Sequence, residues 1–273
     1  MPELPEVEVV CQGLVPHLKG RVFKKVTVSR FSLRRPVPRK MLQKWAVDTT
    51  VVAVRRRAKY CIIELSNGAR LIFHLGMTGR LGIFPETITP IKHDHCRFVM
   101  DNDMEFRFND ARRFGSLQVV APHEDEEDLF VGLGPEPFAK EFCSEYLRAR
   151  SAGRQQPVKN FLMDNRVVVG IGNIYASETL FEAGLSPLRP AKEVNSKEWQ
   201  KVVSHARIVL KRAIKAGGST ISDFVSSSGE PGYFQLKLKV YGRSGQECKA
   251  CGGIIQKKVL AGRATFFCEK CQK

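Results

Sequence analysis

Apolar runs rich in β-forming residues recur through residues 22–120 and predict short β-strands. The runs richest in β-branched and aromatic residues are residues 26–28, 51–54, 60–65, 70–75, 96–100 and 104–108. Asn67-Gly68 predicts a hairpin turn, and the Asp-Asn-Asp triplet at residues 101–103 predicts a second one. Many short antiparallel strands indicate a sandwich or a barrel.

Apolar residues spaced three or four apart predict helices at the start of the chain and in its second half. Val7 and Val10 share a face of the first helix, which Pro5 begins and Gly20 ends. Residues 219–234 are polar and glycine-bearing, which predicts a long loop of a kind that is often functional. Further helices are predicted over residues 139–150, 157–165, 174–184 and 197–216.

These patterns predict an α+β fold with two lobes, and two domains agree with the usual domain size for 273 residues. The acidic run at residues 124–128 and the glycine- and proline-bearing stretch at 132–137 mark a linker between them. The expected parts are an N-terminal helix with an antiparallel β-sandwich (1–132), a linker and the start of a helical domain (133–155), the helical domain (156–234), and a finger (235–273).

Composition predicts the cellular location of the chain and argues against a membrane span or a signal peptide. No run of 18 apolar residues appears, so no membrane span is expected. The N-terminus is acidic rather than basic and apolar, so it does not have the pattern of a signal peptide. We therefore expect a cytoplasmic protein.

Charge points to a polyanionic partner. The formal net charge is +16, and a surplus of this size favours nucleic acid, although a solvated basic surface is the alternative. Nine basic and no acidic residues lie between Lys19 and Lys40, and residues 235–273 hold nine basic residues against two acidic ones. This segregation predicts one positive face.

Four cysteines near the C-terminus have the spacing of a metal site. They form a C-x2-C-x16-C-x2-C pattern, which is typical of a structural zinc ion with four thiolate ligands. The segment is too short to hold a core of its own, so the metal would supply folding energy. Two disulfides are the alternative. The predicted ligands of one Zn²⁺ are Cys248, Cys251, Cys268 and Cys271.

The residues between the two cysteine pairs predict a β-hairpin. Val259 and Phe267 fit its alternating apolar positions, and Ala261-Gly262-Arg263 would form its turn. Arg263 would then lie at the tip of a metal-clamped finger, where a guanidinium is well suited to bind a phosphate. An ordinary exposed arginine is the alternative.

The first residues after Met1 carry a candidate nucleophile. Removal of Met1 would expose the secondary amine of Pro2 beside the carboxylate of Glu3. An α-amine titrates near pH ~8 and a lysine near ~10.4, so far more of the terminal amine is neutral at pH 7. A secondary amine that attacks a sugar aldehyde carbon gives an iminium ion. The alternative is that Pro2 only permits Met1 removal and starts a helix.

Taken together, these features resemble the bacterial formamidopyrimidine-DNA glycosylase family from one end of the chain to the other. Leu4 matches the members that act on oxidised purines, whereas the sister endonuclease VIII group usually has glycine there. The motifs that carry the resemblance are residues 2–6 (PELPE), 57–59 (RAK), 74–77 (HLGM), 93–95 (HDH), 110–115 (DARRFG), 133–137 (LGPEP), 170–175 (GIGNIY) and the finger with Arg263.

The resemblance implies a bifunctional DNA glycosylase and abasic-site lyase of base excision repair. Pro2 would attack the sugar C1′ and form a Schiff base, and Glu3 would donate a proton during ring opening. Lys59 would act in β-elimination of the 3′ phosphate. Arg263 would act in δ-elimination, where we interpret it first as a phosphate clamp because its guanidinium stays charged. The helical domain is expected to be a helix-two-turn-helix.

The resemblance also implies how the protein binds DNA. The target base must leave the helix, and Met77, Arg112 and Phe114 match the residues that fill the space; core positions for Met77 and Phe114 are the alternative. Glu6 and Glu178 would be supporting carboxylates, and the loop 219–234 would read the lesion. The other DNA contacts implied are His93, Arg154, Lys159, Asn173 and Tyr241. The expected partner is duplex DNA with oxidised purines or abasic sites, bound by a monomer in a bacterial nucleoid.

Two other classes of function remain possible from the residues alone. A zinc-finger DNA-binding module without catalysis fits the charge and the cysteines, but it would need neither the Pro2-Glu3 terminus nor Lys59. A metal-dependent nuclease fits less well. The four cysteines leave the zinc no open coordination position, and no carboxylate cluster suggests a second metal.

Overall fold

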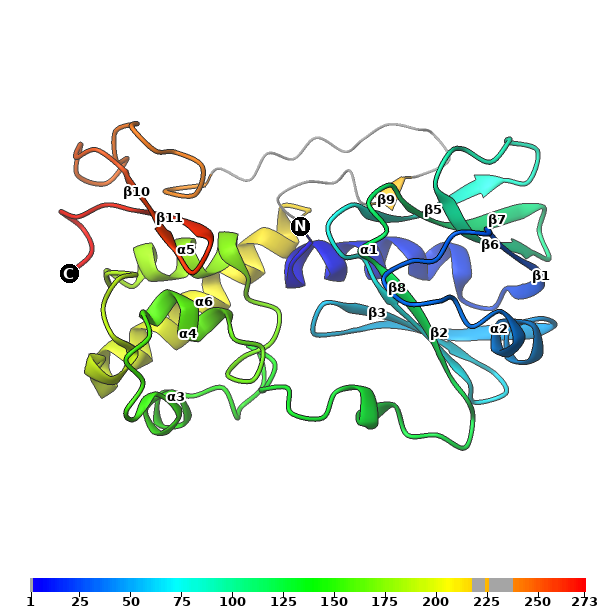
Figure 1. Ribbon diagram of the computed structural model, residues 1–273, viewed down its shortest axis with the longest axis horizontal. Helices are drawn as coiled ribbons and strands as arrows, with labels where there is room; N and C mark the ends of the chain where they lie inside the picture. The colour runs from blue at the N-terminus through cyan, green and yellow to red at the C-terminus, as the bar shows by residue number, and fades with distance from the viewer. Residues whose placement is uncertain (1, 218–223, 226–237) are drawn as a thin grey trace. The chain divides into compact units, whose positions relative to one another are not determined.

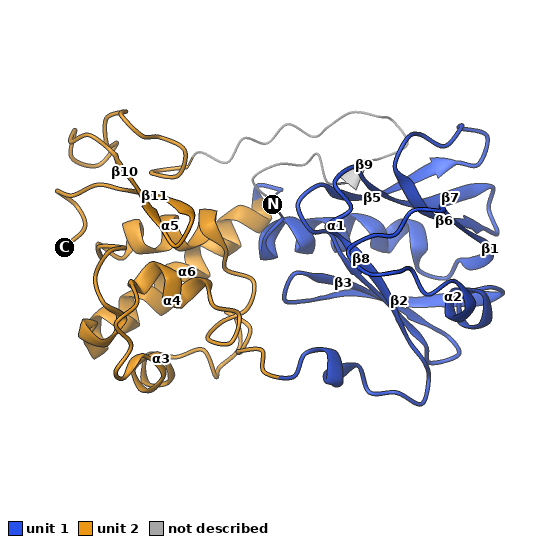
Figure 2. Ribbon diagram, in the orientation of Figure 1, with its two compact units in different colours: residues 1–131, 216–235 blue, residues 132–215, 236–273 orange. Residues whose placement is uncertain are grey.

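The computed structural model describes residues 2–217, 224–225 and 238–273 (Figure 1). The chain forms two compact units (Figure 2). Unit 1 comprises Met1–Val131 and Ala216–Gln235, and unit 2 comprises Gly132–Lys215 and Leu236–Lys273. Among the helices of the described residues, none has the length and apolar character needed to cross a lipid bilayer.

Unit 1 is built on a nine-stranded sheet in the order β8-β4-β3-β2-β1-β6-β7-β5-β9. Neighbouring strands are antiparallel except for β5 and β9, which are parallel. The strands are β1 (Val22–Val28), β2 (Thr49–Arg57), β3 (Tyr60–Leu65), β4 (Arg70–His74), β5 (Gly79–Pro85), β6 (Asp94–Met100), β7 (Met104–Asp110), β8 (Ser116–Val120) and β9 (Phe224–Val225).

The sheet folds over a single apolar core. Phe73 of β4 packs its ring against Phe98 of β6 and against Phe106 and Phe108 of β7, with ring centroids 6.2, 5.5 and 5.6 Å away. The two halves of the sheet therefore face each other as a sandwich, one of the two arrangements that many short antiparallel strands predict. Helix α1 (Leu4–Leu18) packs against β2 and β3, and its apolar face belongs to the same core.

Unit 2 contains four helices and a separate hairpin among its described residues. The helices α3 (Ser144–Ser151), α4 (Val158–Met163), α5 (Asn173–Glu182) and α6 (Ser196–Lys215) share one core around Trp199. The hairpin pairs β10 (Gln256–Leu260) with β11 (Arg263–Phe267). A short 3₁₀ turn, η2 (Ala191–Glu193), precedes α6. The predicted α+β class with a helical region and a four-cysteine hairpin is confirmed.

Three local expectations differ from the structure. The predicted helix over 139–150 begins only at Ser144, because the Arg207 side chain binds the carbonyls of Pro137, Ala139 and Phe142 and holds that segment in turns. Helix α2 (Arg39–Trp45) was not predicted, since Leu42 is its only buried residue. In the segment 219–234, Phe224–Val225 form β9, and the other residues lie outside the described part of the chain.

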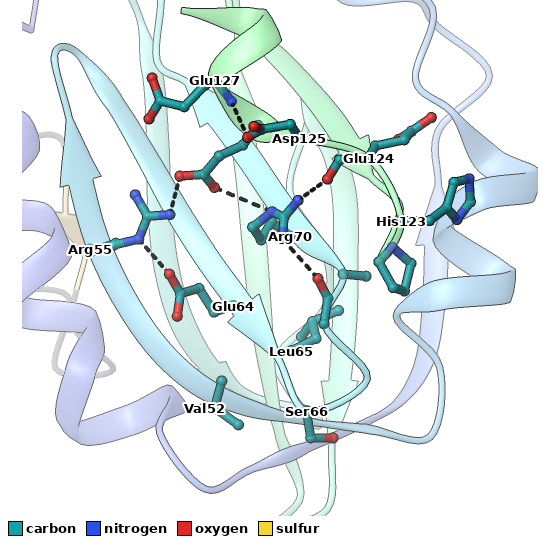
Figure 3. A pocket seen from close by; sticks show the side chains of 14 residues that line it. Val52, Arg55, Glu64, Leu65, Ser66, Arg70, His123, Glu124, Asp125 and Glu127 are labelled. Carbon is teal, nitrogen blue, oxygen red and sulfur yellow. Dashed lines mark hydrogen bonds and ion pairs between the residues drawn. The ribbon is translucent and has the colours of Figure 1, made fainter.

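The acidic run that was expected to begin a linker is instead fastened to unit 1. Residues Glu126–Leu129 form a 3₁₀ turn, η1, and Glu126 makes ion pairs with Arg55 and Arg70. Arg55 also binds Glu64 at 2.5 Å, and these side chains line a surface pocket (Figure 3). Glu126 therefore neutralises two strand arginines, whereas the other acidic residues of the run are exposed.

Candidate nucleic-acid interface and metal centre

The N-terminal residues begin helix α1 through a reciprocal cap. The main-chain N–H of Glu3 donates to Glu6 Oε2 at 2.9 Å, and the Glu3 carboxylate accepts from the main-chain N–H of Glu6. Pro5 lies in the first turn, as expected. Pro2, Glu3 and Glu6 are all buried. Glu6 thus supports the terminus by holding the Glu3 backbone, and Glu3 lies at the positive end of the helix dipole.

Lys59 lies in the two-residue turn between β2 and β3. Ala58 has a positive φ of 53°, which makes the turn tight. Arg56 donates to the carbonyl of Ala58 at 3.0 Å and to Glu8 Oε2 on α1 at 2.7 Å. One guanidinium therefore fastens the turn that carries Lys59 to the helix that follows Pro2.

His74, at the end of β4, lies close to the same positive charge. Burial lowers its pKa to about 4, and the charges of Lys59 and Arg34 contribute. Nδ1 of His74 accepts a hydrogen bond from the main-chain N–H of Gly76 at 3.0 Å. The ring is therefore neutral at pH 7 and holds the start of the β4–β5 loop.

Met77, Arg112 and Phe114 are presented on two neighbouring loops, β4–β5 and β7–β8. Met77 is 41% exposed and Phe114 is 46% exposed, so neither occupies a core position. The guanidinium of Arg112 lies over the Phe114 ring, 4.6 Å from its centroid. The loops approach backbone to backbone, since a Cβ added to Gly76 would lie 2.5 Å from the carbonyl carbon of Phe114.

His93 lies beside these loops, in the turn before β6. It is half-buried with a positive φ of 75°, and its ring centroid is 6.1 Å from that of His95. His95 is buried between Ser29 and the Asp110 carbonyl, at 2.9 and 3.0 Å. The structure thus gathers four predicted contact residues in unit 1. They are His93, just before β6, and the three exposed residues of the β4–β5 and β7–β8 loops.

The four predicted metal ligands come together in unit 2. A tetrahedral ion with thiolates at about 2.3 Å requires sulfur atoms about 3.8 Å apart. The Sγ atoms of Cys248 and Cys271 are 3.8 Å apart, those of Cys251 and Cys268 are 3.5 Å apart, and all four lie within 4.8 Å of one another. The thiolates therefore fit one zinc ion with no open position.

The hairpin held by this metal site carries Arg263. Its turn is Ala261-Gly262, with φ values of 45° and 73°, and Leu260 pairs with Arg263. Arg263 is therefore the first residue of β11 rather than part of the turn, and it is exposed. Of the two predicted apolar positions, Phe267 is buried but Val259 is exposed.

Lys159 differs from its expected place. Its side chain is 0% exposed, and Nζ donates to the Ala264 carbonyl and to Thr265 Oγ1, both at 2.8 Å. A direct phosphate contact does not fit this burial. The sequence did not predict a buried position for Lys159, because lysines are rarely buried. Lys159 instead anchors the hairpin strand next to Arg263.

Asn173 reaches the same carbonyl from the first turn of α5. Its Nδ2 donates to the Ala264 carbonyl at 3.1 Å, while Oδ1 is buried without a hydrogen-bond partner among the described residues. Gly172, not Asn173, occupies the N-cap position. The Asn173 side chain therefore faces the hairpin and does not cap α5.

Glu178 holds the chain where it enters the finger. The buried carboxylate accepts the main-chain N–H groups of Lys239, Val240 and Tyr241, each at 2.9 Å. Tyr241 in turn packs its ring on Phe266 of β11, with centroids 5.1 Å apart. Arg154 lies elsewhere in unit 2, exposed in the turn after α3.

Some residues that support the site were not singled out by sequence reasoning. Arg56, Thr78 and Asp110 hold loops that carry predicted site residues, and Asp110 stands inside a motif that was recognised as a whole. These residues could have been found from their position next to predicted site residues, because a polar residue beside a functional loop residue often holds it in place.

Comparison with known proteins accounts for the chain from end to end. Residues 1–117 match the family model of the formamidopyrimidine-DNA glycosylase N-terminal domain, and residues 133–225 match that of the formamidopyrimidine-DNA glycosylase H2TH domain. Residues 245–273 match the zinc finger found in FPG and IleRS, which together with the sulfur geometry confirms one structural zinc.

Similar sequences and similar solved structures point to the same family as the family models. Formamidopyrimidine-DNA glycosylases of Laribacter hongkongensis and Hahella chejuensis are 48% and 46% identical over 273 residues, covering all of both chains. The Thermus thermophilus MutM (Fpg) crystal structure is 37% identical with a TM-score of 0.84, covering 99% of this chain and 98% of that one. A Lactococcus lactis FPG mutant complexed with Fapy-dG containing DNA is 30% identical with a TM-score of 0.88, covering both chains fully.

Proposed function

Because the chain belongs to the formamidopyrimidine-DNA glycosylase family, we propose that it excises oxidised purines from duplex DNA and then cleaves the abasic site. Its relatives include proteins solved with Fapy-dG DNA and with abasic-site DNA, which supports damaged duplex DNA as the partner. The observation that carries the proposal is the buried Pro2-Glu3 terminus and the Lys59 turn joined in one unit through Arg56 and Glu8.

The first chemical step is nucleophilic displacement by Pro2 after removal of Met1. The nitrogen lone pair forms a bond to C1′, and the bond from C1′ to the base breaks with its electrons leaving on the base. The attached amine then loses a proton. Glu3 is its covalent neighbour and lies at the positive end of the helix dipole, so it takes up that proton.

Ring opening and strand cleavage follow. Glu3 returns its proton to the ring oxygen as the C1′–O4′ bond breaks, which leaves an iminium ion between Pro2 and C1′. Water then takes a proton from C2′, a C2′=C3′ double bond forms, and the C3′–O bond breaks so that the 3′ phosphate leaves with a proton supplied by Lys59 (β-elimination). Arg263 holds the remaining phosphate for δ-elimination through a charge-assisted contact.

DNA recognition uses side chains of both units. Met77 and Phe114 fill the space that the extruded base leaves, and Arg112 contacts the base left unpaired. Asn173 and Tyr241 join in binding the DNA backbone beside the hairpin. Lys159 acts through the hairpin rather than on a phosphate. His93 and Arg154 add further contacts to DNA.

A covalent trapping experiment tests the nucleophile. The zinc-loaded full chain, with Met1 removal verified by intact mass, is mixed with an 8-oxoguanine duplex and sodium borohydride. We expect a stable protein–DNA adduct, and we expect Pro2→Gly to keep DNA binding but lose most turnover.

Two results would count against the proposal. Undiminished turnover of Pro2→Gly would remove Pro2 as the nucleophile. Tight binding without any adduct or cleavage by the processed wild-type chain would favour a DNA-binding module without catalysis.

A further inference from the structure

Asp110, the last residue of β7, is a buried carboxylate that joins the two loops carrying Met77, Arg112 and Phe114. It is 0% exposed. Its Oδ1 accepts the hydroxyl hydrogen of Thr78 at 2.5 Å, and its Oδ2 accepts the main-chain N–H of Gly115 at 2.7 Å. One carboxylate thus holds the β4–β5 loop with one oxygen and the β7–β8 loop with the other.

Thr78 completes the connection. Its hydroxyl oxygen accepts the main-chain N–H of Arg112 at 3.1 Å while its hydrogen goes to Asp110. The hydroxyl therefore bridges a buried charge and the backbone of the residue proposed to contact the unpaired base. Valine could fill the same space but could make neither bond.

Close backbone packing also restricts movement of these two loops. A Cβ on Gly115 would meet the His74 carbonyl oxygen at 2.7 Å, and one on Gly79 would meet the Leu75 carbonyl oxygen at 2.3 Å. Backbone contact keeps the loops close, and the Thr78–Asp110 pair fixes their register. The side chains beside these anchors remain exposed.

We propose that Thr78 is a positioning residue that, through Asp110, makes Met77, Arg112 and Phe114 act as one rigid wedge. This rests on the proposed function of those three side chains. An ordered wedge lowers the conformational entropy lost when it enters DNA. Thr78 therefore affects the step in which the base leaves the helix and not the steps on the sugar.

The test compares Thr78→Val with Thr78→Ser on two substrates. One is a duplex with 8-oxoguanine, whose base must be extruded, and the other is the same duplex with a preformed abasic site. Single-turnover rates are measured for both. We expect Thr78→Val to slow base excision about tenfold, a loss in the range of one charge-assisted hydrogen bond.

Cleavage of the abasic duplex should stay within about twofold of the wild-type rate, since no base has to be displaced. Thr78→Ser keeps the hydroxyl and should restore excision. Stopped-flow fluorescence of 2-aminopurine beside the lesion should show the same slow phase in Thr78→Val only.

Equal slowing on both substrates would overturn the proposal, because it would indicate general damage to the unit. So would unchanged excision by Thr78→Val, or failure of Thr78→Ser to recover it. If Thr78→Val unfolds, Asp110→Asn provides the same comparison, since one amide oxygen and one NH₂ group cannot accept both bonds. A wild-type chain inactive on both duplexes would refute the proposed function instead.

Discussion

Asp110, Lys159 and Glu178 are buried ionisable side chains, and each binds main-chain groups of a segment that carries a proposed site residue. Burying a charge is costly unless hydrogen bonds compensate it, so each fixes its segment in one arrangement. The sequence could not distinguish these residues from surface charges, because the partner groups belong to the backbone and have no side-chain signature. Lys159 was misplaced for that reason.

His74 makes stability depend on pH. Its pKa in the folded protein is about 4, below the ordinary value near 6.5, so the unfolded chain binds a proton more readily. The stabilisation is present above pH ~6.5 and is lost as the pH falls towards 4, by up to about 3 kcal/mol. His74→Asn keeps an acceptor for Gly76 but does not titrate.

Urea unfolding of both proteins at several pH values measures this difference. The stability of the wild type relative to His74→Asn should fall between pH 7 and pH 4. A constant difference over that range would show that His74 does not bind protons differently in the folded and unfolded states.

Among the secondary-structure elements, most positions followed from β-forming runs and helical spacing, but α2, β5 and β8 were not located and element ends often differed. Strand β3 matches its predicted range, since its apolar and aromatic run is bounded by turns. Helix α3 starts late because Arg207 binds the carbonyls of Ala139 and Phe142, which the longer helix would use. Arg207 lies 65 residues beyond Phe142 along the chain, so no local pattern shows this contact. The short strand β9 pairs in parallel with β5, and such a distant partner leaves no local pattern.

The β10–β11 hairpin is supported by the zinc site and by side chains of α4 and α5, among them the Lys159 anchor. Lys159→Met removes two hydrogen bonds to β11 but keeps an apolar stem in the buried site. We expect a loss of about 1–3 kcal/mol in unfolding free energy and slower δ-elimination, because the backbone beside Arg263 is released. Zinc content should be unchanged.

Lys257→Met is the matched control, since Lys257 is exposed on β10. It should change stability by no more than about 0.5 kcal/mol. Denaturation of the zinc-loaded proteins and product analysis on an abasic duplex measure both effects. If the two variants behave alike, Lys159 is not an anchor of the hairpin.

For the whole molecule, the +16 charge should make DNA binding strongly dependent on salt. Three proposed cationic contacts, Lys59, Arg154 and Arg263, give a slope of about −2.7 in log K against log salt if each neutralises one phosphate, or roughly a fortyfold loss of affinity between 50 and 200 mM. Fluorescence anisotropy on an undamaged duplex measures it.

Arg154→Gln should reduce that slope by about 1. Arg166→Gln is the control, because Arg166 is exposed but already paired with Asp164 at 2.9 Å. Equal slopes for all three proteins would remove Arg154 from the DNA contacts.

The division into units also restricts how the chain can be cut. The backbone passes from one unit to the other three times, after Val131, after Lys215 and after Gln235. A gene fragment ending at Val131 would encode the sandwich without strand β9, and a fragment starting at Gly132 would carry that strand with no sheet to join. A cut at this joint therefore leaves the sandwich incomplete, whereas the second fragment keeps every residue of unit 2.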